Sequence, residues 1–506
     1  MSQHSDPDGP ATTRPTADAA ADRPQDWEAP GAALVRSAAT DVIPTLAELG
    51  RVHVMGIAGA GMSGLARILL DRGLAVSGCE ARESTTVQAL RALGAEVFIG
   101  HSVEHLRDAD TFVYTTAINP KHEELVAARA SGMRVLRRAA ALAAGLEDKR
   151  CVAIAGTHGK TSTTSLLTVG AQACGVDPSF AIGGNLYETG RNAHLGSGDL
   201  AVVEADESDG SFLLTRPAAA IVTNVEADHL ENHGDLEGIF RAFEQFVDRI
   251  DPAGLLLACA DDAGARRIAE YARGTGRRVR TYGESEDADL RVSAITPQPD
   301  GVEFTVAGPA VSQRTVRVGS LIGRHMALNA AAALGMAAEL GLDLDTVTRA
   351  WAGFAGVHRR FESHGEGGGV RVYDDYAHHP TEIAASLTAA RAAAGAGRLI
   401  AVFQPGTYSR TQTFRHEFAE AMAIADIAVV MDIFPAREEP IPGVTGATIS
   451  DLIELPPEQV IYEPRYDEVP RRIAEVARPG DLVITMGIGN VYLLCDDIRN
   501  ACGGVA

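Results

Sequence analysis

The sequence predicts an α/β protein that consists of three consecutive α/β domains. Three observations support this prediction. Short apolar strands alternate with helical stretches along most of the chain, as in parallel sheets that are covered by helices. Several strands end in a glycine-rich or acidic turn. The chain has 506 residues, which fits about three domains of roughly 150 residues each.

The N-terminal segment differs from the rest of the chain. Its first 30 residues are rich in Asp, Pro, Ala and Thr and contain almost no large apolar side chain. We therefore expect residues 1–44 to be a disordered tail. Neither a signal-peptide core nor a run of roughly 18 apolar residues is apparent, so we expect a cytoplasmic protein that does not use a membrane.

The first domain is expected to span residues 45–148. An apolar strand at 51–55 leads into residues 56–64, which we call the glycine loop. Within it, 59–64 match the pattern G-x-G-x-x-G, which places a diphosphate on a helix N-terminus. Glu80 follows where an acidic ribose ligand would lie, so an NAD-binding domain stays open at this point. Further strands are expected at 74–77 and 111–114.

The most specific motif is Ala-Gly-Thr-His-Gly-Lys-Thr, which follows an apolar strand at 151–155. Gly156 and Gly159 allow backbone N–H groups to face a phosphate without a Cβ clash. Lys160 can reach the β- and γ-phosphates, and the Thr161 hydroxyl can bind Mg²⁺. The fit to the general nucleotide pattern is incomplete, because only two residues separate the glycines. We call residues 156–161 the phosphate loop.

Two further motifs follow strands of the second domain. Residues 204–210 are acidic and come after a strand at 200–203, at the edge where α/β sheets bind ligands. Carboxylate oxygens suit Mg²⁺. Residues 223–229 end in His229, which is either a second-metal ligand or a structural histidine. The second domain is expected over 149–355, with another strand at 220–223, a strand-rich insertion at about 286–320 and a helix at 325–340.

The third domain is expected over residues 356–506. Charged and aromatic residues gather directly after its apolar strands, which is costly unless they are paired or used. Such residues occupy 357–361, 374–380 and 403–410. The expected strands are 370–373, 399–403, 427–430 and 482–485.

The net charge limits which partners we expect, and the cysteines indicate the cellular compartment. The chain has 45 basic and 67 acidic residues, a net charge of −22. An acidic surface of this size argues against nucleic acid as a partner, and anionic substrates would need locally placed cations. The six cysteines form no C-x-x-C pair, which is typical of a reduced, cytoplasmic protein.

Taken in order, these motifs resemble those of the Mur ligase family of amino-acid ligases. The resemblance covers about residues 48–495. Within the family, the residues at 157–160, 206–212 and 374–380 resemble most those of the branch that joins L-alanine to UDP-N-acetylmuramic acid. The matching segments are 56–64, 156–161, 204–212, 224–229, 325–329, 359–361 and 374–380.

The resemblance implies a Rossmann-like UDP-binding domain, a central P-loop ATPase domain and a Rossmann-like C-terminal domain that receives the amino acid. It implies ATP and Mg²⁺ as cofactors and an acyl-phosphate route in peptidoglycan precursor synthesis. We expect the protein to be a monomer or a weak homodimer. The implied ATP-binding residues are Gly156, Thr157, His158, Gly159, Lys160, Thr161, Ser162, His325, Asn329, Arg360 and Asp375.

The resemblance also implies catalytic, metal-binding and substrate-binding residues. Lys160, Glu204, His229, Arg360 and Asp375 are the expected catalytic set. The expected metal ligands are Thr161, Glu204 and His229, with His229 at a second metal. The expected substrate-binding residues are Gly59, Ala60, Gly61, Met62, Thr115, Thr116, His378 and Arg410.

The chain departs from the family pattern in three places. It has Met326 after His325, Gly406 and Thr407 after Phe-Gln-Pro, and Cys79-Glu80 where Ser-Asp is usual. Three alternatives stay open: a recycling ligase that attaches a tripeptide to the same UDP-sugar, an NAD oxidoreductase, and a UDP-sugar-binding regulator without activity.

Overall fold

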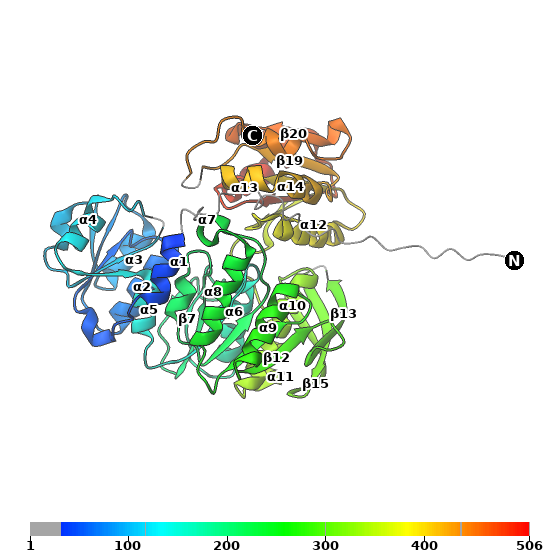
Figure 1. Cartoon of the computed structure of the whole chain (residues 1–506). Coiled ribbons are helices and arrows are strands. Elements are labelled where there is room, and N and C mark those ends of the chain that lie inside the picture. Colours follow the sequence, from blue (N-terminus) through cyan, green and yellow to red (C-terminus); the bar gives the residue numbers. More distant parts are fainter. Residues whose placement is uncertain (1–31, 117, 299, 436–437, 505–506) are drawn as a thin grey trace.

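The computed structural model describes residues 32–116, 118–298, 300–435 and 438–504. Three β-sheets follow one another along the chain, and each lies within one of the three predicted domains. In Figure 1 the N-terminal domain lies at the left, the central domain at the bottom and the C-terminal domain at the top. The prediction of three consecutive α/β domains is confirmed, whereas the positions of the boundaries stay predictions.

The N-terminal sheet has five parallel strands in the order β3-β2-β1-β4-β5. Strand β1 is central and buried along its whole length. The glycine loop that follows it therefore lies at the carboxyl edge of the sheet. The strands are β1 Val52–Met55, β2 Val76–Glu80, β3 Glu96–Ile99, β4 Thr111–Tyr114 and β5 Arg134–Arg137. The helices are α2 Ala60–Asp71, α3 Thr85–Ala92, α4 Glu123–Ala130 and α5 Arg138–Gly145, with short 3-10 turns η2 Leu46–Leu49 and η3 Val103–Leu106.

The central sheet has ten strands in the order β15-β14-β13-β12-β11-β10-β6-β9-β7-β8. Its middle is parallel, and the predicted strand-rich insertion forms the antiparallel strands β13–β15. The strands are β6 Arg150–Ala155, β7 Ser179–Ala181, β8 Ala193–His194, β9 Leu200–Glu204, β10 Ala219–Val222, β11 Leu255–Cys259, β12 Arg278–Gly283, β13 Leu290–Gln298, β14 Gly301–Gly308 and β15 Val311–Gly319. The helices are α6 Lys160–Ala173, α7 Leu230–His233, α8 Leu236–Arg249, α9 Ala263–Gly274, α10 Arg324–Glu339 and α11 Leu344–Ala352, with the 3-10 turn η4 Ser211–Leu214.

The C-terminal sheet has six strands in the order β16-β17-β21-β18-β19-β20, and only β16 is antiparallel to its neighbour. The strands are β16 Glu362–Gly367, β17 Val370–Asp375, β18 Leu399–Phe403, β19 Ile427–Met431, β20 Val460–Glu463 and β21 Leu482–Met486. The helices are α12 Pro380–Ala394, α13 Tyr408–Thr413, α14 Arg415–Met422, α15 Ala447–Ser450, α16 Val469–Val476 and α17 Cys495–Cys502, with the 3-10 turns η5 Pro457–Gln459, η6 Tyr466–Glu468 and η7 Val491–Leu494.

Part of the predicted tail is ordered. Residues Ala32–Thr40 form helix α1, which packs against η4 and α7 of the central domain. Ala38 is fully buried there, and the buried Arg137 at the end of β5 binds Ser37 and forms an ion pair with Asp41. The expected disorder is therefore wrong for this helix, because a few apolar and polar contacts anchor it. Residues 1–31 lie outside the described residues.

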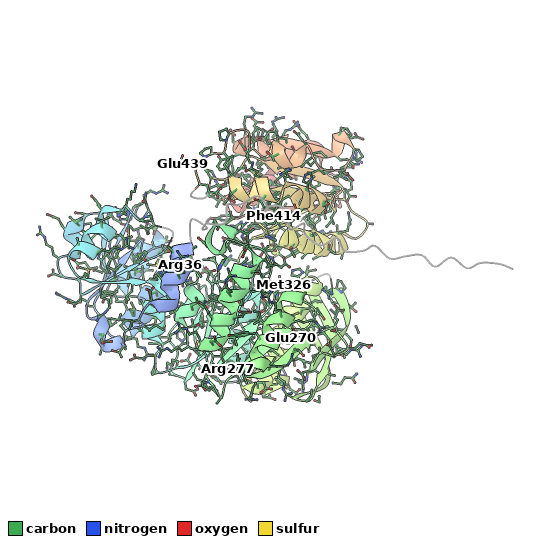
Figure 2. All side chains as sticks on the ribbon, in the orientation of Figure 1. Arg36, Glu270, Arg277, Met326, Phe414 and Glu439 are labelled. Atoms are coloured by element: carbon green, nitrogen blue, oxygen red, sulfur yellow. The ribbon has the colours of Figure 1, made fainter. Side chains whose placement is uncertain are left out.

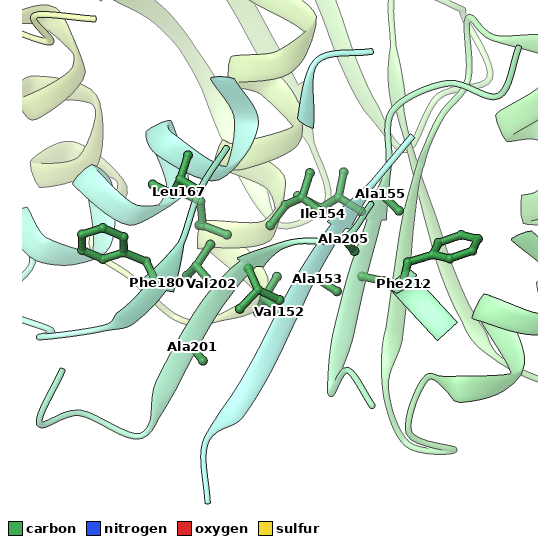
Figure 3. Packing of buried hydrophobic residues seen from close by; sticks show 14 of the residues in the cluster. Val152, Ala153, Ile154, Ala155, Leu167, Phe180, Ala201, Val202, Ala205 and Phe212 are labelled. Atoms are coloured by element: carbon green, nitrogen blue, oxygen red, sulfur yellow. The ribbon is translucent and has the colours of Figure 1, made fainter. Parts of the chain in front are cut away.

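The hydrophobic core joins the first two domains. One cluster of buried side chains runs from β1 and α2 through β6 and α6, whereas the C-terminal domain has separate clusters on the two faces of its sheet. Figure 3 shows Val152 and Ile154 of β6 on the same side as Leu167 and Val202, whereas Phe212 lies on the other side of the strand. Among the described residues, no helix has the length and apolar character needed to cross a membrane.

Candidate functional site

The phosphate loop joins β6 to α6 at the carboxyl edge of the central sheet. Gly156 and Gly159 have φ angles of 133° and 85°, which favour glycine. A Cβ atom on Gly156 would lie 2.0 Å from Thr223 Oγ1, and one on Gly159 would lie 2.4 Å from Asn329 Oδ1. The loop therefore needs glycine at both positions for its backbone path and for its close packing.

Residues from the neighbouring β10 turn brace the loop. Thr223 Oγ1 donates to the His158 carbonyl at 2.6 Å, and Asn224 Oδ1 accepts from the His158 amide at 2.8 Å. Thr157 Oγ1 accepts from the Glu226 amide at 3.0 Å. These bonds hold the predicted phosphate-binding backbone in one conformation at the start of α6.

Lys160 lies in the loop and does not extend into solvent. Its Nζ atom donates to the Gly156 carbonyl at 2.6 Å and to Glu207 Oε2 at 2.7 Å. Burial disfavours the charged amine, but the carboxylates of Glu207 and Asp206 outweigh this and hold the pKa of Lys160 above its ordinary value. The ammonium group is therefore charged and already positioned near the loop backbone.

Thr161 and Glu204 face each other across the edge of the sheet. Thr161 Oγ1 lies 3.1 Å from both carboxylate oxygens of Glu204, and the Gly183 amide donates to Glu204 Oε2 at 2.7 Å. A hydroxyl and a carboxylate held this close are the hard oxygen donors that Mg²⁺ prefers. The two residues therefore fit the predicted metal.

His229 contacts residues other than Thr161 and Glu204. It has a φ of 52° and stands between two carboxylates, with Nδ1 3.3 Å from Glu231 Oε1 and Nε2 3.5 Å from Asp228 Oδ2. Burial disfavours the imidazolium, but Glu231 and Asp228 raise the pKa of His229 to about 9. A protonated imidazole donates hydrogen bonds and does not bind metal, so a second metal here would have to displace the proton.

A pocket of about 140 Å³ lies between the central and C-terminal domains next to the phosphate loop. Most of the predicted nucleotide contacts meet there, and Met326 of α10 lies on the side of the central domain that faces the C-terminal domain (Figure 2). The predicted residues that line the pocket are His158, Gly159, Ser162, His325, Asn329, Arg360 and Asp375.

Residues 360 and 375 belong to the C-terminal domain but reach the central one. Arg360 Nη2 donates to Thr161 Oγ1 at 3.3 Å. Asp375 accepts the Phe361 amide at 2.9 Å and the Ala377 amide at 2.8 Å, which fixes the carboxylate beside Arg360. Met326 fills the place after His325, and its sulfur accepts from Asn329 Nδ2 at 3.7 Å.

His158 also links the two domains. Its Nδ1 lies 3.1 Å from Glu382 Oε1 of α12, and its Nε2 lies 3.4 Å from Glu226 Oε2. Thr381 Oγ1 donates to the same Glu226 oxygen at 2.8 Å. Burial opposes protonation, but Glu382 and Glu226 raise the pKa of His158 to about 10. The phosphate loop is thus held against the C-terminal domain by charge.

The glycine loop borders a second cavity, of about 380 Å³, between the N-terminal and central domains. Gly59 precedes α2, and Gly59, Ala60 and Gly61 are exposed while Met62 is buried. Arg138 at the start of α5 and Glu204 line this cavity together with Gly61. The cavity therefore extends from the glycine loop to the carboxylate that adjoins the phosphate loop.

Arg138 supplies a positive charge to the wall of this cavity. A Cβ atom on Gly61 would lie 3.1 Å from its Cδ, so the guanidinium stem lies against the loop. Arg138 also lines an adjoining cavity of about 270 Å³ with Glu204 and Asp206. Among the described residues, its side chain forms no hydrogen bond or ion pair. An Arg with this placement suits an anionic group.

The remaining predicted substrate residues have protein partners. Thr116 Oγ1 donates to Asp209 Oδ2 at 2.6 Å, so it connects β4 to the acidic motif. His378 Nδ1 lies 2.9 Å from the Tyr376 carbonyl, and burial lowers the pKa of His378 to about 4. Arg410 forms a buried ion pair with Asp228, next to His229. Thr115 adjoins Thr116 at the end of β4.

Sequence reasoning missed four residues of these sites: Glu207, Glu226, Glu382 and Arg138. Glu207 and Glu226 lie inside motifs that were recognised, but nothing in the spacing identifies them as partners of Lys160 and His158. Glu382 stands four residues after His378 at a helix start. Arg138 is one of several arginines near β5, and only the packing of α5 on the glycine loop distinguishes it.

Comparison with known proteins places this geometry in a family. Residues 51–150 match the Mur ligase family catalytic domain, residues 154–337 the Mur ligase middle domain and residues 359–489 the Mur ligase glutamate ligase domain. The chain belongs to the Mur ligase family. The UDP-N-acetylmuramate–L-alanine ligase of Saccharopolyspora erythraea is 50% identical over 475 residues, which are 93% of this chain and 96% of that protein.

Two solved structures show the same arrangement. The UDP-N-acetylmuramate–alanine ligase of Thermotoga maritima superposes with a TM-score of 0.75 at 26% identity, over 90% of this chain and 100% of that chain. The murein peptide ligase of Psychrobacter arcticus superposes with a TM-score of 0.67 at 25% identity, over 90% of this chain and 99% of that chain. The family match includes the glycine loop and removes the NAD oxidoreductase alternative.

Proposed function

We propose that this chain catalyses the ATP-dependent ligation of L-alanine to the carboxylate of UDP-N-acetylmuramate, in the biosynthesis of peptidoglycan precursors. The observation that carries the proposal is the 50% identity to a ligase of that name over 96% of its length. The phosphate loop with Lys160 and Thr161, together with Glu204, which faces it from the end of β9, supports an active ligase rather than a non-catalytic regulator.

The reaction that we propose has two transfers. A carboxylate oxygen of the UDP-sugar attacks the γ-phosphorus of ATP and ADP leaves, which makes an acyl phosphate. The amine of L-alanine then attacks the acyl carbon, phosphate leaves, and the amine loses a proton. The protein's contribution to such a phosphoryl transfer is mainly positioning and charge neutralisation.

The roles of the residues follow from where they lie. Lys160 holds its ammonium at the start of α6 and neutralises charge on the nucleotide phosphates. Thr161 and Glu204 would hold Mg²⁺, which would neutralise further phosphate charge. Arg360 approaches the same hydroxyl from the C-terminal domain, so the nucleotide contacts are complete only when both domains are together.

The UDP-sugar is placed in the cavity between the first two domains. The backbone of the exposed Ala60 and Gly61 at the start of α2 suits the diphosphate, and Arg138 supplies a positive charge beside it. The same cavity reaches Glu204, so the sugar carboxylate approaches the nucleotide at that end. This arrangement explains how an acidic protein binds an anionic substrate through a local cation.

The recycling ligase is the closest alternative, because it shares the UDP-sugar and the fold. Acceptor choice separates the two. Purified protein with ATP and UDP-N-acetylmuramate should release phosphate with L-alanine and Mg²⁺ and not with the tripeptide. Omission of any one component should abolish the release. Equal phosphate release without the UDP-sugar, or a preference for the tripeptide, would contradict the proposal, and Lys160→Ala protein serves as the inactive control.

A further inference from the structure

A buried carboxylate in the N-terminal domain has an unusual set of neighbours. Glu124 at the start of α4 is fully buried, and its ion-pair partners among the described residues are all histidines. His101 Nδ1 lies 3.2 Å from Glu124 Oε2, His105 Nδ1 lies 3.7 Å from Oε1, and His122 Nδ1 lies 4.0 Å from Oε2. Burying a carboxylate is costly unless a cation compensates its charge.

A thiol completes a compact triangle with two of these groups. Cys79 Sγ at the end of β2 lies 3.3 Å from Glu124 Oε2 and 3.2 Å from His101 Nδ1. With the 3.2 Å between Glu124 and His101, all three edges are nearly equal. Ligands of a tetrahedral zinc ion, bound at about 2.0–2.3 Å, lie roughly 3.3–3.8 Å apart. The triangle is therefore close to the spacing that a zinc ion requires.

His53 of β1 offers a fourth ligand atom. A ring nitrogen of His53, Cys79 Sγ and a Glu124 oxygen all lie within 4.8 Å of one another. His53 is fully buried, its Nδ1 lies 3.0 Å from Ser77 Oγ, and its Nε2 has no hydrogen-bond partner among the described residues. A hydrogen bond at one ring nitrogen that leaves the other free is the usual arrangement of a metal-binding histidine.

His122 is a weaker choice for the fourth ligand. Its Nδ1 already accepts the Glu124 amide at 3.3 Å, where it caps the N-terminus of α4. His53 has no such competing role at Nε2. The unpartnered nitrogen of His53 therefore points to a ligand that the protein itself does not supply.

We propose that Cys79, His101, Glu124 and His53 form a structural zinc site in the N-terminal domain, separate from the magnesium that accompanies ATP. Binding forms one S–Zn, one O–Zn and two N–Zn bonds, and the Cys79 thiol proton leaves to solvent. A thiolate, a carboxylate and two neutral imidazoles around Zn²⁺ have no net charge, which suits burial. Sulfur, nitrogen and oxygen donors together favour zinc over magnesium.

The zinc site would stabilise the strands and the helix that position the glycine loop. Cys79 and His53 lie on adjacent strands, and the Ile57 amide donates to the Cys79 carbonyl at 3.0 Å. His101 follows β3, and Glu124 begins α4. One ion would thus tie β1, β2, the segment after β3 and α4 together below the loop. The proposal does not depend on which amino acid the enzyme ligates.

Metal content of the full-length protein tests the proposal. We expect about one zinc ion per chain after purification with zinc present, and a thiolate-to-metal charge-transfer band when cobalt replaces zinc. Cys79→Ser, which is nearly isosteric, should lose the zinc and the band. Cys259→Ser changes a buried thiol of β11 and should keep both. A chelator should lower the melting temperature of the wild type but not of Cys79→Ser.

Each outcome is decisive. Wild-type protein that binds no zinc, or zinc that Cys79→Ser and Glu124→Gln both retain, would overturn the site. If the variants do not fold, the cobalt spectrum of the wild type decides, because only a thiolate ligand gives the charge-transfer band and Cys79 is the thiol beside these histidines. Wild-type protein that takes up no zinc but shows normal ligase activity would overturn the site and leave the proposed function intact.

Discussion

The phosphate loop and the glycine loop occupy equivalent places in neighbouring domains but are equipped differently. Each follows a parallel strand and opens a helix, and each begins with a glycine of positive φ, 133° at Gly156 and 61° at Gly56. The phosphate loop continues with Lys160 and Thr161, whose side chains meet Glu207 and Glu204. The glycine loop continues with Ala60, Gly61 and Met62, none of which carries charge.

Because of this difference, the phosphate loop is equipped for phosphoryl transfer, whereas the glycine loop is equipped only for binding. A loop that carries its own cation and metal-binding hydroxyl can neutralise charge that develops during phosphoryl transfer. A loop with only backbone N–H groups can hold a diphosphate, but it must obtain its cation elsewhere, here from Arg138 on α5. Changes in the first loop should therefore affect turnover, and changes beside the second should affect the affinity for the UDP-sugar.

Lys160 gives the largest expected effect. We expect Lys160→Ala to lower kcat at least about 10²-fold, the scale of losing one preorganised charge at a transition state. KM for the UDP-sugar should change little, because that substrate lies in the other cavity. Steady-state phosphate release checks this, with Lys121→Ala, an exposed lysine of the N-terminal domain, as the control. Near-normal kcat would remove Lys160 from the chemistry.

Substitution of Glu204 should change how the activity depends on the Mg²⁺ concentration. We expect Glu204→Gln to raise the Mg²⁺ concentration needed for half-maximal activity by at least about tenfold, because an amide oxygen is a weaker ligand than a carboxylate. Thr161→Val, which removes the facing hydroxyl, should shift the same curve in the same direction. A titration of phosphate release with Mg²⁺ measures both. Unchanged Mg²⁺ curves in the two variants would exclude this pair as the metal site.

Arg138 tests the other half of the comparison. We expect Arg138→Ala to raise KM for UDP-N-acetylmuramate about 10- to 100-fold, the loss of a charge-assisted contact of about 1.5–3 kcal/mol. The KM for ATP and kcat should change much less. Arg107→Ala, an exposed arginine of the same domain, is the matched control. If Arg138→Ala lowered kcat as much as Lys160→Ala does, the assignment of phosphoryl transfer to one loop and substrate binding to the other would be wrong.

Much of this architecture follows from local patterns. The strands at 111–114, 399–403 and 200–203 reappear almost unchanged, because buried parallel strands are continuous apolar runs with turn residues at their ends. The strand expected at 74–77 begins later, at Val76, since Leu74 and Ala75 connect the turn after α2 to the strand. The recognised motifs converge because carboxyl ends of parallel strands share one edge.

What could not be predicted depends on contacts between distant segments. Helix α1 is stabilised by contacts with Arg137, η4 and α7, none of which its composition reveals. Arg410 was expected to face the substrates, but in this structure it is paired with Asp228 of another domain, so its substrate role stays a prediction. Glu382 becomes a partner of His158 only when the two domains meet.

The smallest expected effect is a pH dependence that the phosphate loop should have and the glycine loop should lack. The pKa of His158 is about 10 in the folded protein, against an ordinary value of 6.5. A raised pKa means that protonation stabilises the folded state, so this contribution is complete below about pH 6.5 and is lost as the pH rises toward 10. Its slope is at most about 1.4 kcal/mol per pH unit.

Comparison of the wild type with His158→Gln isolates this contribution, because His229 and other titrating groups are present in both. We expect the variant to be less stable than the wild type at pH 6.5 and the difference to narrow steadily up to pH 10. Unfolding free energies at several pH values between these limits measure the difference. His416→Gln, which changes an exposed histidine of α14, is the control for loss of an imidazole elsewhere and should not give this slope. If wild type and His158→Gln differ by the same amount at every pH, the carboxylates of Glu382 and Glu226 do not hold a proton on His158, and the charged link between the phosphate loop and the C-terminal domain is wrong.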